Sequence, residues 1–369
     1  MNRSLRILSI LVALIALVVG IVGKIAPHLF FKIPNVGFIL WAITGHSLPP
    51  YISFDMYEEG RTDWLKKNDV IVSVGVKAGT TWMLYCSHQI RIKGHDEKYP
   101  FIDPMIATPW PSFVEKPGDT WENKWNKLNT VILPDGTPLK QYWDNPDYPF
   151  RIFKAHELPE TFGSLVGGDK VKFLTMARNG LDTVTSFVPF VNQHTDEFRA
   201  LWGGFPPKLS ANITKETKKH LKLMSPGQLL EQLHFGYVNS WWKVKDEKNV
   251  LLLHFSDVKK DLPGSVSKLA EFYGVELSPE EKATVVEKCS FPHMKKHTNL
   301  FTYSLPLNPN FNGSAINAGG LTRKGRNGDG DNIFSVEEKA AWAKIEEEVY
   351  GDDPIKLNWA RNGGDYSTN

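Results

Sequence analysis

A lysine, a glycine and two threonines follow a short apolar run and form the part of the sequence best suited to chemistry. Residues 69–74 predict a buried strand, and residues 82 to about 91 predict a helix from their spacing. The loop between them is Lys77-Ala78-Gly79-Thr80-Thr81. A helix N-terminus presents unpaired N–H groups and partial positive charge, to which the lysine and the hydroxyls add. The segment therefore predicts an anion site of the phosphate type.

The loop differs from the phosphate loop of nucleoside triphosphatases. In that pattern, G-x-x-x-x-G-K-[ST], the lysine directly follows the second glycine. Here Lys77 precedes Gly79, and the hydroxyl that would hold magnesium has no matching position. An ordinary triphosphatase is therefore disfavoured, and a strand-to-helix turn that simply needs a glycine is the plainer alternative.

A histidine and a lysine stand at the end of a second apolar run, residues 150–155. His156 leaves this predicted strand at the sheet edge where ligands of parallel sheets bind. The ordinary pKa of an imidazole, about 6.5, suits proton abstraction at neutral pH. Lys154 lies two residues earlier. Taken alone, His156 is more readily explained as a surface or packing histidine, so a role as general base depends on the segments around it.

Two further segments carry cations. Arg178 follows a third apolar run, where its planar guanidinium is suited to clamp a phosphate, and Ser186 on the next helix would add a hydroxyl. The plainer alternative is an ion pair between Arg178 and Asp182. Near the C-terminus the loop Arg323-Lys324-Gly325 lies among further glycines and can either wrap an anion or form a solvated basic loop.

Together these four segments resemble the sulfotransferase family, most closely its cytosolic branch, which uses 3′-phosphoadenosine 5′-phosphosulfate (PAPS), over roughly residues 50–340. The resemblance implies that the first loop binds the 5′-phosphosulfate, that Trp82 stacks on adenine, and that no metal is needed. It also implies that His156 is the catalytic base and that Lys77 and Lys154 stabilise charge. The residues implied to bind the nucleotide are Lys77, Ala78, Gly79, Thr80, Thr81, Trp82, Arg178, Ser186, Phe255, Phe291, Arg323, Lys324 and Gly325.

The sequence departs from the family pattern at a few positions. Ala78 stands where serine is common, Phe255 where tyrosine is usual, and Gly330 where the family has tryptophan. The dimer motif of the cytosolic branch is not recognisable after that glycine, so the resemblance implies no oligomeric state.

The chemical segments need a common scaffold. Four apolar runs, residues 70–76, 150–155, 172–177 and 249–255, alternate with helical segments, which predicts a mainly parallel sheet with helices on both faces. The expected fold is α/β, a P-loop-like three-layer domain with an N-terminal transmembrane helix. A long aromatic region between residues 110 and 148 either shapes an acceptor site or packs on the core as a flap.

The N-terminus has a different composition. Residues 7–23 contain no charged residue, and the length of this stretch is near the minimum for a membrane span. An interfacial portion would be added by Phe30, Phe31 and residues 36–43. We favour an uncleaved single-pass anchor over a cleaved signal peptide or a soluble hydrophobic helix. Lumenal and cytosolic facing both stay open, because flanking positive charges are nearly balanced. The expected division is 1–48 for anchor and juxtamembrane segment, 49–360 for the sulfotransferase domain, and 361–369 for a polar, frayed tail.

Composition narrows the function. The formal net charge of the 369 residues is +2, which gives no bulk attraction for nucleic acid, and two cysteines are too few to build a metal site. We expect a sulfotransferase that moves a sulfuryl group to a hydroxyl or amine of a small, lipophilic acceptor. The alternatives are a membrane-tethered module that binds adenosine bisphosphate without catalysis and, with less support, a small-molecule kinase.

Overall fold

A sheet of four parallel strands lies at the centre of the domain in the computed structural model, which describes residues 3–58 and 60–366, with side chains from Ile7 onward. The strand order within these residues is β2-β1-β3-β4. The predicted parallel α/β architecture is confirmed. The first strand ends at residue 73, one residue before the predicted end of the strand and three before the end of the apolar run, and residues 74–76 belong to the loop. The strands are β1 (Asp69–Ser73), β2 (Ile152–Ala155), β3 (Val171–Ala177) and β4 (Val250–His254).

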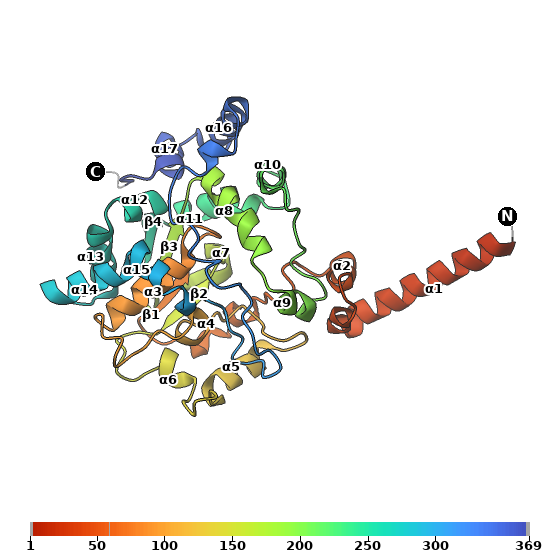
Figure 1. Cartoon of the computed structure of the whole chain (residues 1–369), viewed down its shortest axis with the longest axis horizontal. Helices are drawn as coiled ribbons and strands as arrows, with labels where there is room; N and C mark the ends of the chain where they lie inside the picture. The colour runs from red at the N-terminus through yellow and green to blue at the C-terminus, as the bar shows by residue number, and fades with distance from the viewer. Residues whose placement is uncertain (1–2, 59, 367–369) are drawn as a thin grey trace.

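Helices cover both faces of the sheet (Figure 1). Successive side chains of a strand point to opposite faces, so Val70 and Val72 join one buried cluster and Ile71 joins the other. The first cluster includes side chains from α3 (Thr80–Arg91), α13 (Leu262–Tyr273) and α14 (Pro279–Cys289). The second includes side chains from α11 (Phe235–Lys243), α16 (Val336–Tyr350) and α17 (Pro354–Asn362).

The remaining helices surround this core or belong to the excursions from the sheet. They are α4 (Pro104–Ala107), α5 (Trp121–Thr130), α6 (Lys140–Trp143), α7 (Pro159–Phe162), α8 (Gly180–Asn192), α9 (Asp196–Leu201), α10 (Ile213–Leu223), α12 (Phe255–Lys260) and α15 (Phe291–Lys296).

The N-terminal helix α1 (Arg3–Ile25) projects away from the domain (Figure 1). Its stretch Ile7–Ile25 has 19 residues and a mean hydropathy of 2.7, and by length and composition it can cross a membrane. Two short helices follow, a 3₁₀ helix at Pro27–Lys32 and α2 (Gly37–Ile43).

The juxtamembrane segment between α1 and the domain is docked rather than free. Gly203 and Gly204 allow its backbone to approach closely, because a Cβ on Gly204 would lie 2.6 Å from Asn35 Cα and one on Gly203 2.9 Å from Gly37 Cα. Phe30 and Phe31 are buried, although the sequence predicted them to be interfacial. That prediction is wrong for these two residues. The Phe31 ring packs on the domain instead, where its centroid lies 5.4 Å from that of Trp202.

The C-terminal tail is ordered as far as residue 366, so the predicted fraying is wrong for residues 361–366. Helix α17 crosses the expected boundary after residue 360, and the Arg361 guanidinium lies 2.7 Å from Glu346 Oε2. The Tyr366 hydroxyl donates to the Leu252 carbonyl of β4 over 2.6 Å. Residues 367–369 of the predicted tail and residues 1–2 of the predicted anchor lie outside the described residues.

Candidate functional site

The loop between β1 and α3 has the backbone geometry of an anion site. Lys77 and Gly79 both have positive φ angles, 63° and 106°, and Gly79 is the N-cap of α3 without a side-chain cap. The φ angle of Gly79 favours glycine, and a Cβ there would also lie 2.7 Å from Met176 Cε. No side chain caps the N-terminus of α3. The first N–H groups of this helix therefore stay available to a group bound in the cavity.

The Lys77 ammonium enters this site without a carboxylate partner among the described residues. Its Nζ atom lies 4.0 Å from the centroid of the Phe190 ring. Burial and, secondarily, the positive charges of Arg178 and Arg323 lower the pKa of Lys77 to about 7. An anion placed beside these three cations would restore the charge of Lys77.

Arg178 joins the first loop to the basic C-terminal loop. Its Nη2 donates to the Arg326 carbonyl over 2.7 Å and its Nη1 to the Lys77 carbonyl over 3.4 Å. The ion pair with Asp182 is also present, at 3.6 Å, so Arg178 has a structural role as well. Its Nε is nevertheless buried without a hydrogen-bond partner in the described structure. A buried donor without a partner is costly, and a bound phosphate oxygen would satisfy it.

The basic loop is folded around one carboxylate. Asp329 lies within ion-pair distance of Arg323 at 3.7 Å, of Lys324 at 3.4 Å and of Arg326 at 2.6 Å. Because one carboxylate faces three cations, the loop keeps excess positive charge beside the cavity. It is thus more than the solvated basic loop that the sequence left open.

Aromatic rings stand at the same end of the cavity. Trp82 is held by a 2.7 Å hydrogen bond from its Nε1 to the Cys289 carbonyl, and its ring lies 5.5 Å from that of Phe255. Gly325 packs against Phe291, since a Cβ there would lie 2.3 Å from the ring. These rings form the apolar walls that a flat heterocycle requires.

His156 is oriented as a base. Its Nδ1 lies 2.7 Å from the Val74 carbonyl, which can only accept, so the proton sits on Nδ1 and the lone pair on Nε2. Glu157 Oε2 accepts the backbone N–H of His156 over 2.6 Å and fixes the chain there. Burial and, secondarily, the neighbouring Lys154 lower the pKa of His156 to about 3. The imidazole is therefore neutral at physiological pH.

Lys154 lies between two aromatic rings. Its Nζ is 3.3 Å from the Trp110 ring centroid and 4.5 Å from that of Tyr303. Trp110 is in reach because Lys154 N–H donates to the Pro109 carbonyl over 2.9 Å. Burial drives the pKa of Lys154 well below its ordinary value. Tyr303, whose hydroxyl lies 3.3 Å from Thr81 Oγ1, was not predicted from the sequence, and no local motif marks it.

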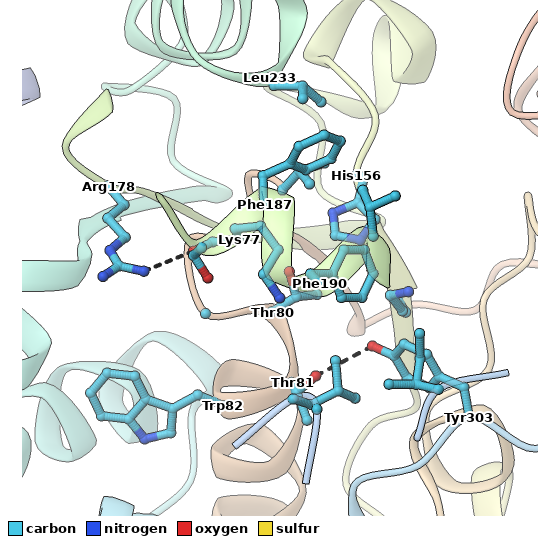
Figure 2. A pocket seen from close by; sticks show the side chains of 18 of the residues that line it. Lys77, Thr80, Thr81, Trp82, His156, Arg178, Phe187, Phe190, Leu233 and Tyr303 are labelled. Carbon is cyan, nitrogen blue, oxygen red and sulfur yellow. Dashed lines mark hydrogen bonds between the residues drawn. The ribbon is translucent and has the colours of Figure 1, made fainter. Parts of the chain in front are cut away.

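One cavity of about 980 Å³ brings the predicted segments together. Figure 2 shows Arg178 and Trp82 toward one end and His156 and Tyr303 toward the other. Ala78 packs in the core and its N–H donates to the Gly75 carbonyl, so its contact with the nucleotide stays a prediction. The other predicted residues line the cavity: Lys77, Gly79, Thr80, Thr81, Trp82, Lys154, His156, Arg178, Ser186, Phe255, Phe291, Arg323, Lys324 and Gly325.

Beyond His156 the cavity is largely apolar. Glu157 lines it, but both of its carboxylate oxygens are used, by the Ser112 hydroxyl and by the backbone of His156. Trp110, in the aromatic region that the sequence left open, lines the cavity and so favours the acceptor-site interpretation. The apolar side chains here are Leu48, Tyr51, Ile52, Phe54, Met105, Trp110, Phe113, Phe187, Phe190, Val191, Phe198, Phe205, Leu229 and Leu233.

A parallel sheet with an anion loop at its edge and a neutral histidine between a cationic pocket and an apolar pocket define a group-transferring α/β enzyme. The family model described as "Sulfotransferase domain" matches residues 67–354. The chain belongs to the sulfotransferase family, whose enzymes take the sulfuryl group from PAPS.

Curated relatives and solved structures agree with this family. The amine sulfotransferase of Oryctolagus cuniculus is 24% identical over 303 residues, covering 81% of this chain and 86% of the relative. Sulfotransferase 2A1 of Rattus norvegicus is 25% identical, covering 80% and 89%. A mouse sulfotransferase complexed with PAP superposes with a TM-score of 0.53 at 19% identity, covering 79% and 87%. Retinol dehydratase in complex with retinol and PAP gives 0.58 at 19% identity, covering 83% and 87%.

Proposed function

We propose that this sulfotransferase transfers the sulfuryl group of PAPS to a hydroxyl or amine of a small, lipophilic acceptor, with His156 as the general base. The observation that carries the proposal is the orientation of His156, whose proton is fixed on Nδ1 while Nε2 is left for the acceptor. The orphaned Nε of Arg178 and the uncapped N-terminus of α3 fit the phosphates of the nucleotide. The basic loop would hold the 3′-phosphate, while Trp82, Phe255 and Phe291 would flank adenine.

In the proposed step His156 Nε2 takes the proton of the acceptor while the acceptor oxygen or nitrogen bonds to sulfur. The bond between sulfur and the bridging oxygen of the 5′-phosphate breaks, and adenosine 3′,5′-bisphosphate (PAP) leaves. General-base catalysis of this kind contributes about 10²–10⁴-fold. The imidazole must be neutral at the start, which its lowered pKa ensures.

Lys77 and Lys154 are proposed to stabilise the charge that develops in this step. Both are desolvated, so an anion beside them interacts far more strongly than it would in water. Loss of one such preorganised donor typically costs about 10²–10³ in rate. Lys77 follows β1 and Lys154 lies in β2, and these strands are neighbours in the sheet, so the two ammonium groups approach the sulfuryl group from separate elements.

The lipophilic character of the acceptor follows from the walls of its pocket. Aromatic and aliphatic side chains dominate there, and the Glu157 carboxylate is already satisfied. In the apolar part of the cavity a highly charged acceptor would lose its hydration without gaining a counter-charge other than those of Lys77 and Lys154. A sterol, phenol or long-chain alcohol would be bound by burial of apolar surface alone.

Two alternatives have less support. A module that only binds the nucleotide does not need an oriented imidazole in its cavity, yet two hydrogen bonds hold His156, one from its Nδ1 to the Val74 carbonyl and one from its backbone N–H to Glu157 Oε2. A kinase with a phosphate loop needs a hydroxyl that holds magnesium, and the order of Lys77 and Gly79 leaves no matching position for it. Labelled transfer with a chelator present tests this point: undiminished sulfation supports the proposal, and strict magnesium dependence contradicts it.

The decisive experiment replaces the base. His156→Ala should lower kcat for transfer of labelled sulfate by about 10²–10⁴-fold while the Kd for PAP changes little. His220→Ala is the matched control, because His220 is also buried but lies outside the cavity. Turnover by His156→Ala at a rate near that of the unmodified chain would remove His156 from the role of base.

We also propose that α1 anchors the enzyme to a membrane and that residues 49–366 form the sulfotransferase domain behind it. The exposed apolar surface of α1 and its length support the anchor. The docking of residues 361–366 on the core supports the extended C-terminal boundary.

A further inference from the structure

The apolar end of the cavity reaches the protein surface through side chains that water should not solvate. Leu48, Phe54 and Leu229 line the cavity and are 44%, 49% and 83% exposed. Single exposed apolar residues are ordinary, but these three all line one largely apolar cavity, so apolar side chains are exposed where it opens. We call these three residues the rim.

An apolar path leads from α1 to this rim. An exposed large apolar side chain recurs at every third to fifth position across the juxtamembrane segment. The 3₁₀ helix and α2 turn their other sides, including Phe30 and Phe31, onto the domain. The exposed apolar side chains thus belong to the side of the segment that does not contact the domain, and the last of them, Leu48, lines the cavity. The residues of the path are Ile25, Leu29, Ile33, Val36, Ile39, Ile43 and Leu48.

Part of the cavity wall directly follows the glycines that contact the juxtamembrane segment. Gly203 and Gly204 touch the backbone of the juxtamembrane segment, and the next residues, Phe205 and Pro206, line the cavity. The Phe205 ring lies 5.8 Å from the ring of Phe38 in α2. The cavity mouth is therefore held in a fixed position relative to the segment that follows the proposed membrane span.

We propose that the acceptor pocket opens onto the bilayer in which α1 is embedded, and that the acceptor enters from the membrane and not from water. This inference rests on the proposed function. The occupant is a lipophilic molecule with one hydroxyl or amine, dissolved among acyl chains. Lys259, Lys324 and Arg326 line the cavity as well, away from the rim, and give the anionic nucleotide a basic entrance from water. The two substrates then reach His156 from different phases.

The test uses a lipid-borne quencher and the full chain reconstituted in vesicles. Both native cysteines, Cys86 and Cys289, are buried, so a single introduced cysteine can be labelled with a polarity-sensitive fluorophore. Leu48→Cys and Leu229→Cys place the label on the rim. Val336→Cys is the matched control, because Val336 is 74% exposed and lies outside the cavity lining. Doxyl-labelled lipids should quench the rim labels at least twofold more than the control, whereas aqueous iodide should do the reverse.

A second measurement follows the acceptor. In a series of 4-alkylphenols of increasing chain length, Leu48→Asp should lower kcat/KM for the longest member about tenfold more than for the shortest. Rim labels that behave like the Val336 label, or a Leu48→Asp effect independent of chain length, would overturn the inference. In that event sulfation of the short phenol and binding of PAP would still uphold the proposed function. Absence of PAP binding would instead overturn the proposed function itself.

Discussion

At the scale of single residues, burial sets the protonation of the proposed catalytic groups before any substrate binds. Desolvation lowers the pKa of His156 to about 3 and that of Lys77 to about 7, and it lowers that of Lys154 strongly. For the histidine this means a base that stays neutral down to acid pH. For the lysines it means that charge is recovered when the anionic donor binds, so donor binding and protonation are coupled.

The affinity for PAP should therefore fall as the pH rises above about 7. Free Lys77 loses its proton there, whereas the complex needs the charged form, so binding must take up a proton. The limit is about tenfold in Kd per pH unit, since one pKa unit corresponds to about 1.36 kcal/mol. Calorimetric titrations between pH 6 and 9, in buffers of different ionisation enthalpy, measure both the affinity and the proton uptake.

Lys77→Arg is the control for this pH dependence. Arginine stays protonated throughout this range, so the affinity of the variant for PAP should fall less steeply above pH 7. Identical pH profiles for the variant and the unmodified chain would assign the coupling to another group.

Arg178→Ala should weaken PAP binding by about 10- to 100-fold, because hydrogen bonds to charged groups contribute about 1.5–3 kcal/mol. Arg178→Lys keeps the charge but cannot reproduce the forked hydrogen bonding of the guanidinium. Its Kd for PAP should therefore lie between those of the unmodified chain and of Arg178→Ala. Because Arg178 also joins two loops, the Tm of the free protein is measured alongside. An unchanged Kd for Arg178→Ala would remove this residue from the phosphate site.

At the scale of elements, the turn from β1 to α3 depends on one glycine. Gly79→Ala should lower the Tm and the affinity for PAP, because a side chain at this φ costs about 1–2 kcal/mol and the new Cβ would meet Met176. Gly136→Ala is the matched control: its φ is 87°, but its Cβ would meet nothing within 4 Å. Equal losses of Tm in the two variants would show that the contact with Met176 adds nothing to the cost of the positive φ, and an unchanged Kd for PAP in Gly79→Ala would show that the loop tolerates a side chain.

The sheet and the first loop could be predicted from the sequence because their signals are local. Residues such as Val70, Ile71 and Val72 are apolar on both faces, as a parallel strand requires, and Lys77 and Gly79 mark the loop directly. His156 and Arg178 were also found, because they directly follow predicted strands.

Other parts of the site come from tertiary contacts that no local pattern records. Tyr303 reaches Lys154 from a loop about 150 residues away in sequence, and its position depends on how that loop packs. The polar C-terminal tail was predicted to fray, but Tyr366 gains a hydrogen bond to β4. The family resemblance implies that Ala78 contacts the donor, and no local pattern shows that its small side chain is part of the core.

At the scale of the whole molecule, α1 should decide where the enzyme is found. The double variant Ile15→Arg/Val18→Arg should move the chain from the carbonate-resistant membrane fraction to the supernatant, since each charge at the centre of a span costs about 2.5–3.5 kcal/mol on insertion. Binding of PAP should persist, because the cavity lining contains no residue of α1. Val336→Arg serves as the control, and a double variant that stays in the membrane fraction would contradict the role of α1.

The close contact of Gly203 and Gly204 with the juxtamembrane segment has a consequence for acceptor choice. With no slack linker between the span and the domain, an anchored enzyme holds His156 at one fixed height above the bilayer. The distance between His156 and the bilayer would then select acceptors. An acceptor reacts only if its hydroxyl reaches His156 while the rest of the molecule keeps contact with the lipid. Lengthening the chain between α1 and the 3₁₀ helix would then change which hydroxyl of a large acceptor is sulfated, without any change in the pocket.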